Sequence, residues 1–251
     1  MFNDQDCNYS SYLKMINIIV NTGRYMDYYD AMEKDDFIVV RHDIEFSIER
    51  AYKLALLESE HKFYTSYFVQ LANNTYNALS QRNLDLLKAI ASLGHHIGLH
   101  YNAASISDLG EIQDGIILQA DILSAFLDIR IDRFSFHRPS PMVLKSNMMI
   151  SGLINVYSKE FFTFTEDVST LSVNDVQYLS DSNHQWKYGQ PTSEWINRHQ
   201  KLQCLFHPLS WSEYGFNHID CFKLLTQEKH TELITSINDE WKYFHLLEGK
   251  L

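Results

Sequence analysis

Cysteine is scarce in this chain of 251 residues, and the three that occur, Cys7, Cys204 and Cys221, lie far apart. An odd and widely spaced set does not build a disulfide framework, which favours a reducing compartment. No CxxC pair is present, so the composition argues against a zinc site made of thiolates.

Long apolar runs are also missing, and none reaches the length that spans a membrane. The N-terminus, MFNDQDCNYSSYLKM, has no basic stretch followed by an apolar core of the kind that directs secretion. We therefore expect a cytoplasmic protein without a membrane span.

Positive charge is the third scarcity, since 21 Lys and Arg stand against 32 Asp and Glu, which gives a net charge of −11. Contacts to a phosphate backbone need clustered Lys and Arg, so nucleic acid is disfavoured as a partner and a neutral or cationic substrate fits better. No Pro, Gly or Ser tract indicates a linker. We expect a single domain over residues 1–251, with 1–36 as a helical extension packed on it. The sequence leaves the oligomeric state open.

The chain does contain a regular alternation of helical and strand patterns. Residues 9–22 repeat apolar side chains at helical spacing before Gly23, which is placed to end the helix. The β-branched run Phe37 to Val40 predicts a strand, and Ser47 is placed to cap the helix that follows.

The same alternation continues to the end of the chain. KFYTSYFVQL, HHIGLHY, FSFH, INVYS, VQYLSD and LQCLFHP read as further strands, LDLLKAIASLG and IQDGIILQADILSAFL as helices, and 226–247 as a terminal helix. About seven strands that alternate with helices predict parallel pairing through right-handed crossovers, in a closed or nearly closed α/β barrel.

One short stretch, ASLGHHIGLHYN, holds three histidines in six positions. On a helix, His96 and His100 would share a face, as in helical zinc sites. Gly94 instead ends the preceding helix, so the histidines lie on a strand, where His96 and His100 point one way and His95 the other. Only His100 is then at the carboxyl end of the strand.

Ionisable residues follow several of the predicted strands, at the end where barrel enzymes carry their reactive groups. Each such ending is ordinary by itself, because strands often stop at solvated residues. Together they predict one site at the mouth of the barrel, made of the endings RHDIE (His42, Asp43, Glu45), His100, FHR (His137, Arg138) and FHP (His207).

These motifs, in this order, resemble the polysaccharide deacetylases of the NodB-homology fold, also called carbohydrate esterase family four. RHDIE resembles the first motif of the family in an Asp-x-Asp form, and LGHHIGLHY is similar to the GHEIGLH version of the second. YTSYF resembles the strand between them, HRPSP the Arg-Pro motif and LFHP the final Leu-x-His motif. YLSDSNHQW is similar to a segment of a bacterial subgroup associated with surface-polysaccharide gene clusters.

The resemblance covers most of the chain and implies a distorted (β/α)₇ barrel that removes an N- or O-acetyl group from a sugar with the help of a metal. Asp43 matches the general base, which takes a proton from the water that attacks the acetyl carbonyl. Its alternative is a capping or ion-pair role beside the helix at Ser47. Glu45 matches the metal-binding carboxylate, although the family prefers Asp there. Its alternative is a solvated acid favoured by the helix dipole.

The resemblance also implies a metal site, most naturally for Zn²⁺, around His100. The alternative for His100 is a hydrogen-bonded histidine inside the barrel. The second metal histidine of the family falls here on Ala104, so the expected ligand set is incomplete. His137 is our candidate for the missing ligand, with His42 or a water as alternatives.

Two further roles are carried over from the family. Arg138 matches the arginine that holds the catalytic aspartate, and its alternative is a surface arginine beside a turn proline. His207 matches the general acid that protonates the leaving amine, and its alternative is a loop histidine before Pro208.

Substrate contacts are expected from residues that follow strand ends. Asp181 is placed to orient substrate or a histidine, although its surroundings also suit a turn. Trp186, Tyr188 and Trp211 are placed to stack on a sugar ring, with anchoring of the core or a loop as the alternative, and Tyr101 completes the candidate set.

Three functions remain open from the sequence. The first is a deacetylase acting on a sugar or a surface-polysaccharide precursor, such as a nucleotide sugar or a lipid-linked sugar. The second is a hydrolase of small cyclic amides on the same barrel. The third is a catalytically silent barrel that binds a glycan or scaffolds a biosynthetic complex, which the residue Ala104 makes reasonable.

Overall fold

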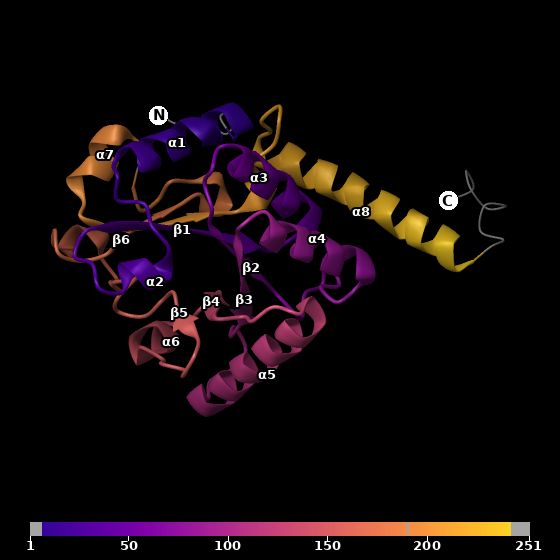
Figure 1. Cartoon of the computed structure of the whole chain (residues 1–251), viewed down its shortest axis with the longest axis horizontal. Coiled ribbons are helices and arrows are strands. Elements are labelled where there is room, and N and C mark those ends of the chain that lie inside the picture. The colour runs from indigo at the N-terminus through magenta and orange to yellow at the C-terminus, as the bar shows by residue number, and fades with distance from the viewer. Residues whose placement is uncertain (1–6, 190, 242–251) are drawn as a thin grey trace.

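Seven parallel strands form one sheet in the computed structural model, which describes residues 7–189 and 191–241 (Figure 1). The strand order is β5-β4-β3-β2-β1-β7-β6. Among the described residues the two end strands are not paired with each other, so the barrel is open between β5 and β6. The prediction of a distorted seven-stranded α/β barrel is confirmed. The strands are β1 Phe37–Ile44, β2 Ser66–Val69, β3 His96–Asn102, β4 Arg133–His137, β5 Ile154–Asn155, β6 Gln177–Ser180 and β7 Lys201–Phe206.

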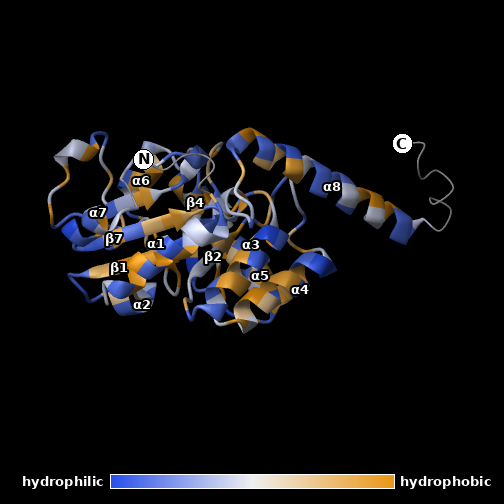
Figure 2. Cartoon of the chain, turned by 90° about the horizontal axis from the view of Figure 1, so that it is seen from above, coloured by the Kyte–Doolittle hydropathy of each residue, from blue (hydrophilic) through white to orange (hydrophobic). Residues whose placement is uncertain are grey.

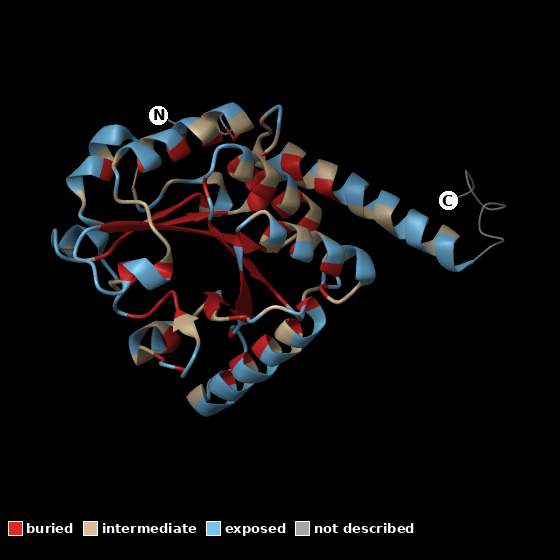
Figure 3. Ribbon diagram, viewed as in Figure 1, coloured by how far each residue is buried: buried red, intermediate tan, exposed pale blue. Residues whose placement is uncertain are grey.

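Helices cover the outside of this sheet, and Figure 3 shows the strands buried between them. Short 3₁₀ turns at Val168–Thr170, Ser182–His184 and Pro208–Ser210 lie in the loops. None of the described helices is both long and apolar enough to cross a membrane. The helices are α1 Tyr9–Asn21, α2 Tyr28–Ala31, α3 Ile48–Glu60, α4 Gln81–Ser92, α5 Leu109–Leu127, α6 Pro141–Ser146, α7 Ser193–Arg198 and α8 His218–Glu240.

The helix boundaries follow the expected local signals. Gly23 has φ +70° and directly follows the C-cap of α1, and Gly94 has φ +101° after α4, a region that side-chain-bearing residues rarely adopt. The Ser47 side chain accepts a hydrogen bond from the backbone N–H of Arg50, which caps α3 as predicted. Gly94 therefore does place the histidines on a strand, with His96 at its start.

The first strand is longer than predicted. We expected it to stop at Val40, before the ionisable residues, but β1 continues to Ile44. The added residues stay buried because each charge meets a partner: Arg41 lies beside Asp43 and His42 lies beside Glu58 of α3. The ionisable stretch is therefore part of the barrel wall and not a solvated strand ending.

Alternation along β1 divides the hydrophobic core into two layers. Phe37 and Val39 belong to the larger cluster, which also takes in residues of α4 and α5, whereas Ile38 and Val40 belong to the outer core layer beneath α1 and α7. Figure 2 shows hydrophobic colour along strands such as β1 and also on helices such as α4 and α5. The inside is tightly filled, since a Cβ at Gly98 would lie 2.6 Å from the Phe68 ring.

The terminal helix begins earlier than predicted. α8 starts at His218, eight residues before the expected start, because the Asn217 side chain caps it by accepting from the N–H of Asp220. Cys221 and Leu225 anchor this first part, and the rest of α8 projects from the barrel (Figure 1). The predicted stretch 242–247 lies outside the described residues.

Candidate active site

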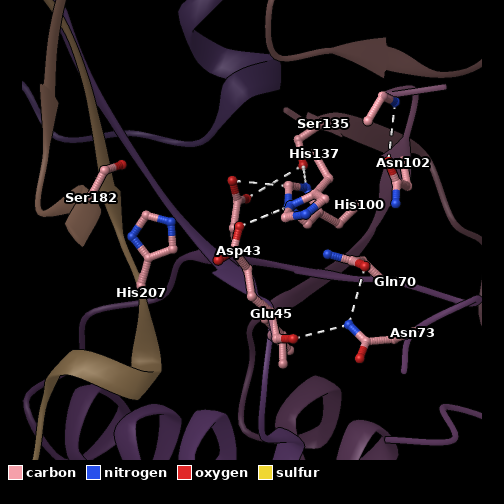
Figure 4. Close-up of polar contacts among 12 residues, drawn as sticks. Asp43, Glu45, Gln70, Asn73, His100, Asn102, Ser135, His137, Ser182 and His207 are labelled. Carbon is pink, nitrogen blue, oxygen red and sulfur yellow. Dashed lines mark hydrogen bonds and ion pairs between the residues drawn. The ribbon is translucent and has the colours of Figure 1, made fainter. Parts of the chain in front are cut away.

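The carboxyl ends of the central strands converge on one cavity of about 750 Å³. Asp43 and Glu45 come from β1 and the turn after it, and His100 from β3. His137 ends β4, and His207 follows β7 on the other side of Asp43 (Figure 4). Five of the seven residues that the sequence analysis placed at the mouth of the barrel are thus brought together, and Arg138 lines the same cavity.

Glu45, His100 and His137 form a cluster with the spacing of metal ligands. One ligand atom from each residue lies within 4.8 Å of the others. Glu45 Oε1 is 2.9 Å from Nδ1 of His137 and 3.8 Å from Nε2 of His100. The two imidazole rings are 5.2 Å apart and nearly perpendicular, so both can direct a nitrogen to one point.

The chemistry of these three groups fits a divalent metal. Nε2 of His100 and Nδ1 of His137 are buried, and within the described residues neither nitrogen makes a hydrogen bond. Two imidazole nitrogens and one ionised carboxylate suit Zn²⁺ or a similar ion and leave positions open for water and substrate.

Ser135 fixes the orientation of His100. Its Oγ lies 2.7 Å from Nδ1 of His100 and donates to Oδ1 of Asp43 at 3.4 Å. A hydroxyl that donates to a carboxylate accepts from the imidazole, which assigns the proton of His100 to Nδ1. Nε2 then turns a lone pair toward Glu45, as a metal ligand requires.

The arginine beside Asp43 is not the one that the motif comparison indicated. Asp43 is 3 % exposed, and Nη2 of the fully buried Arg41 lies 3.4 Å from its Oδ2. Arg138 is exposed at the cavity rim and makes no ion pair within 4 Å in the described chain. The expected contact of Arg138 with Asp43 is therefore wrong, and Arg41 makes that contact instead. Arg41 shares a face of β1 with Asp43, whereas Arg138 lies beyond the end of β4, where its backbone has φ +49°.

Asp181 holds His207 in place. Oδ1 of the buried Asp181 is 2.6 Å from Nδ1 of His207, and both carboxylate oxygens accept from the His207 backbone N–H. Trp211 Nε1 donates to the same carboxylate at 2.8 Å. Burial lowers the pKa of His207, but the charge and hydrogen bond of Asp181 outweigh it and raise the pKa to about 9. His207 is therefore protonated near neutral pH, with Nδ1 bound and Nε2 free to serve the cavity.

This ion pair predicts how the stability of the metal-free protein depends on pH. The folded-state pKa of His207, about 9, exceeds its ordinary value of 6.5. The ion pair therefore makes its full contribution to the stability of the fold below pH 6.5, and this contribution is lost as the pH rises to 9. We expect the free energy of unfolding to fall by up to about 3 kcal/mol over this interval. Urea denaturation at both ends of the interval, with a chelator present, measures the fall.

The His207→Gln variant identifies the source of that fall. Without the imidazole the decrease should vanish, whereas His230→Gln, on the exposed face of α8, should keep it. A decrease of equal size in His207→Gln would show that another group titrates.

The other histidines of the two motifs lie away from the cavity. His42 faces the outer side of β1, and its Nε2 is 2.9 Å from Glu58. The prediction of His42 as an alternative metal ligand is therefore wrong. His95 accepts from the backbone N–H of Thr65 and fills a packing position. His96 is 44 % exposed at the start of β3, near Asp27.

Three aromatic candidates for sugar contacts do not line the cavity. Tyr101 is out of phase with His100 on β3, so it packs outward against Gly115 of α5. Trp211 is buried and holds Asp181, and Trp186 packs beside Phe206 in the outer core layer. The prediction that these three rings contact a sugar is therefore wrong, whereas Tyr188 does line the cavity.

Most aromatic residues of the cavity wall were not among the candidates for sugar contacts, although several of them lie in or beside predicted strands. The segment between β5 and β6 has no periodicity, which explains why its contribution was missed. Ser135 was also missed, although it shares a face of β4 with His137 and alternation indicates it. The wall is made of Phe46, Phe136, Tyr157, Phe162, Phe164, Tyr178, Tyr188 and Phe222.

No protein-family model matches the sequence, and no curated protein matches it. Solved structures that resemble this one include a family 4 carbohydrate esterase from Bacillus anthracis, at 15 % identity and a TM-score of 0.43 over 86 % of each chain. A family 4 pseudoenzyme from Bacillus anthracis is 12 % identical, with a TM-score of 0.41 over 80 % of this chain and 62 % of that chain. The present chain thus spans less than two thirds of the length of that relative.

A third likeness is a family 4 acetyl xylan esterase from Clostridium thermocellum, in complex with a cobalt ion. It is 12 % identical, with a TM-score of 0.39 over 68 % of this chain and 73 % of that chain. The three structures belong to the family that the motifs resemble. They are likenesses of fold, and the roles of the residues in this chain rest on its own geometry.

Proposed function

We propose that this chain is a divergent polysaccharide deacetylase that removes an acetyl group from a sugar by metal-assisted hydrolysis. One observation carries the proposal: across one cavity, the cluster of Glu45, His100 and His137 lies beside a buried carboxylate, Asp43, and opposite a protonated histidine, His207. A carbonyl-activating centre, a base and an acid are the parts that amide or ester hydrolysis needs.

The residues of the chain divide the proton transfers between them. Water adds to the acetyl carbonyl and gives its proton to the Asp43 carboxylate, which Ser135 holds at the cavity floor. His207 gives a proton from Nε2 to the departing sugar nitrogen or oxygen as the bond to the carbonyl breaks. The acyl product leaves as acetic acid, which ionises to acetate in solvent, and the other product is the free amine or alcohol. Asp43 then gives up its proton and His207 takes one up by exchange with solvent, so atoms and charge balance and both groups are restored.

Glu45, His100 and His137 would hold the metal in this scheme. A divalent cation bound there polarises the carbonyl and makes water a better nucleophile near neutral pH. The donor set supports zinc as the first choice.

We further propose an acetylated sugar or surface-polysaccharide precursor of low charge as the substrate, encountered in the cytoplasm. Arg138 is the only Lys or Arg among the described residues that line the cavity. A diphosphate usually meets several cationic or N–H donors, so this lining favours an uncharged sugar over a nucleotide sugar.

Acetate release tests the proposed function. Purified protein loaded with Zn²⁺ should release acetate from at least one member of a panel of N- and O-acetylated sugars, and chelation followed by zinc should remove and restore the activity. Small cyclic amides belong in the same assay. A protein that binds zinc and releases no acetate from any sugar would contradict the proposal.

A further inference from the structure

Arg41 is a buried cation in the middle of β1, on the same face as Asp43. Its side chain is 0 % exposed, and its Nη2 lies 3.4 Å from Oδ2 of Asp43. Removing a guanidinium from water is energetically costly, so such a group persists only where a partner compensates the charge. Although burial lowers the pKa of Arg41, Asp43 and then Tyr157 raise it well above its ordinary value.

Tyr157 is the second partner of the guanidinium. Nη2 of Arg41 donates to the Tyr157 hydroxyl at 2.7 Å, and the guanidinium carbon lies 4.4 Å from the centre of the Tyr157 ring. One hydrogen of Nη2 can therefore serve Tyr157 and the other Asp43. Tyr157 follows β5, so an element distant in sequence sets the position of Arg41.

The two oxygens of Asp43 have separate partners. Oδ2 faces Arg41, while Oδ1 accepts from Ser135, which also positions the metal-facing His100. A carboxylate with one partner can rotate about its side chain, whereas partners on both oxygens fix its plane. Arg41 thus completes the orientation of Asp43 toward the cavity.

Arg133 shows that not every buried arginine of the barrel acts on the site. It is also fully buried and inside the barrel, but on β4 it pairs with Asp27 at 2.6 Å and Asp132 at 2.8 Å, beside the start of β3. Arg133 therefore has the same burial and chemistry at the opposite end of the strands, which makes it a matched control for Arg41.

We propose that Arg41 is the positioning residue of Asp43, taking the place that the family resemblance gives to Arg138. The inference rests on the function proposed above, because it assumes that Asp43 is the base. Arg41 does not line the cavity and acts only through the carboxylate that it holds.

The Arg41→Gln and Arg133→Gln variants of the zinc-loaded protein test this role. Arg41→Gln should lower kcat by about 100-fold, with KM and zinc affinity unchanged within about threefold, because only the base is displaced. Arg133→Gln should lower the Tm as much or more and leave the kcat of the folded protein within about threefold of wild type. Arg41→Lys, which keeps the charge, should recover part of the lost kcat.

Two outcomes would overturn the role of Arg41: a kcat for Arg41→Gln within about threefold of wild type, or an equal kcat loss in Arg133→Gln. If Arg41→Gln does not fold, Tyr157→Phe replaces it. That variant removes the hydroxyl that holds Nη2. Because Tyr157 also lines the cavity, a reduced kcat at a wild-type Tm and a wild-type KM supports the role, whereas an unchanged kcat, or a loss seen in KM alone, overturns it.

A failure of the proposed function gives a different result. If wild-type protein releases no acetate from any substrate, the role of Arg41 is decided by crystal structures of the wild type and Arg41→Lys. An Asp43 carboxylate that turns away from Ser135 in the variant supports the positioning role, and an unmoved carboxylate overturns it.

Discussion

An Asp43→Asn variant should lose turnover by about 10²- to 10⁴-fold, the usual contribution of a positioned general base. Asparagine keeps the size of the side chain and a hydrogen-bond acceptor for Ser135, but it cannot take a proton from water. The metal cluster does not include Asp43, so zinc affinity should stay near that of the wild type. Acetate release and zinc titration on the same preparation measure both quantities.

Asp132→Asn is the matched control for this variant. Asp132 also pairs with a buried arginine, Arg133, but at the end of β4 that is remote from the cavity. Its replacement should lower stability without changing kcat. An Asp43→Asn protein that binds zinc and retains wild-type kcat would show that another group acts as the base.

Most of the metal cluster was predictable because it depends on local rules. Gly94 ends a helix, alternation on the next strand selects one face, and the carboxyl end of that strand selects His100. The same reasoning at the ends of two other strands gives Glu45 and His137. Parallel strands place their carboxyl ends at one rim, so no long-range information was needed to bring these residues together.

Arg41 was missed because its role depends on burial, which the strand pattern concealed. A run of Arg, His and Asp after four apolar residues is typical of a strand that ends in solvent, and the strand was therefore predicted to stop at Val40. The run stays in the sheet because its charges are compensated by Asp43 itself and by Glu58, which is contributed by a separate helix. Such pairing is a property of the tertiary structure and has no local signature.

The aromatic predictions failed for a related reason. Position after a strand end does not say which way a ring points: Trp211 turns inward to Asp181, and Tyr101 is out of phase with its neighbour His100. Some of the rings that do line the cavity, such as Phe162 and Phe164, come from an irregular segment in which no periodicity fixes a face.

Replacing His137 with alanine should reduce zinc affinity by more than about 100-fold, since even residues that only support a metal ligand contribute 10- to 100-fold. His137 supplies one of the three ligand atoms, and its Nδ1 lies 2.9 Å from Glu45. Without His137, Glu45 and His100 remain as ligands. Residue 104, where the resembled family has its second metal histidine, is an alanine in this chain and cannot replace it. Calorimetric titration of the metal-free protein with Zn²⁺ measures the change.

His96→Ala separates this effect from a general loss of histidine. His96 lies on the same face of β3 as His100 but at its start, away from the cavity, so this variant should bind zinc as the wild type does. Wild-type affinity in His137→Ala would instead leave Glu45 and His100 as a two-residue site, which is too few protein ligands for a zinc enzyme. The test measures zinc binding alone and needs no substrate. It therefore decides whether His137, at the end of β4, has replaced the metal histidine that the resembled family has at the position of Ala104.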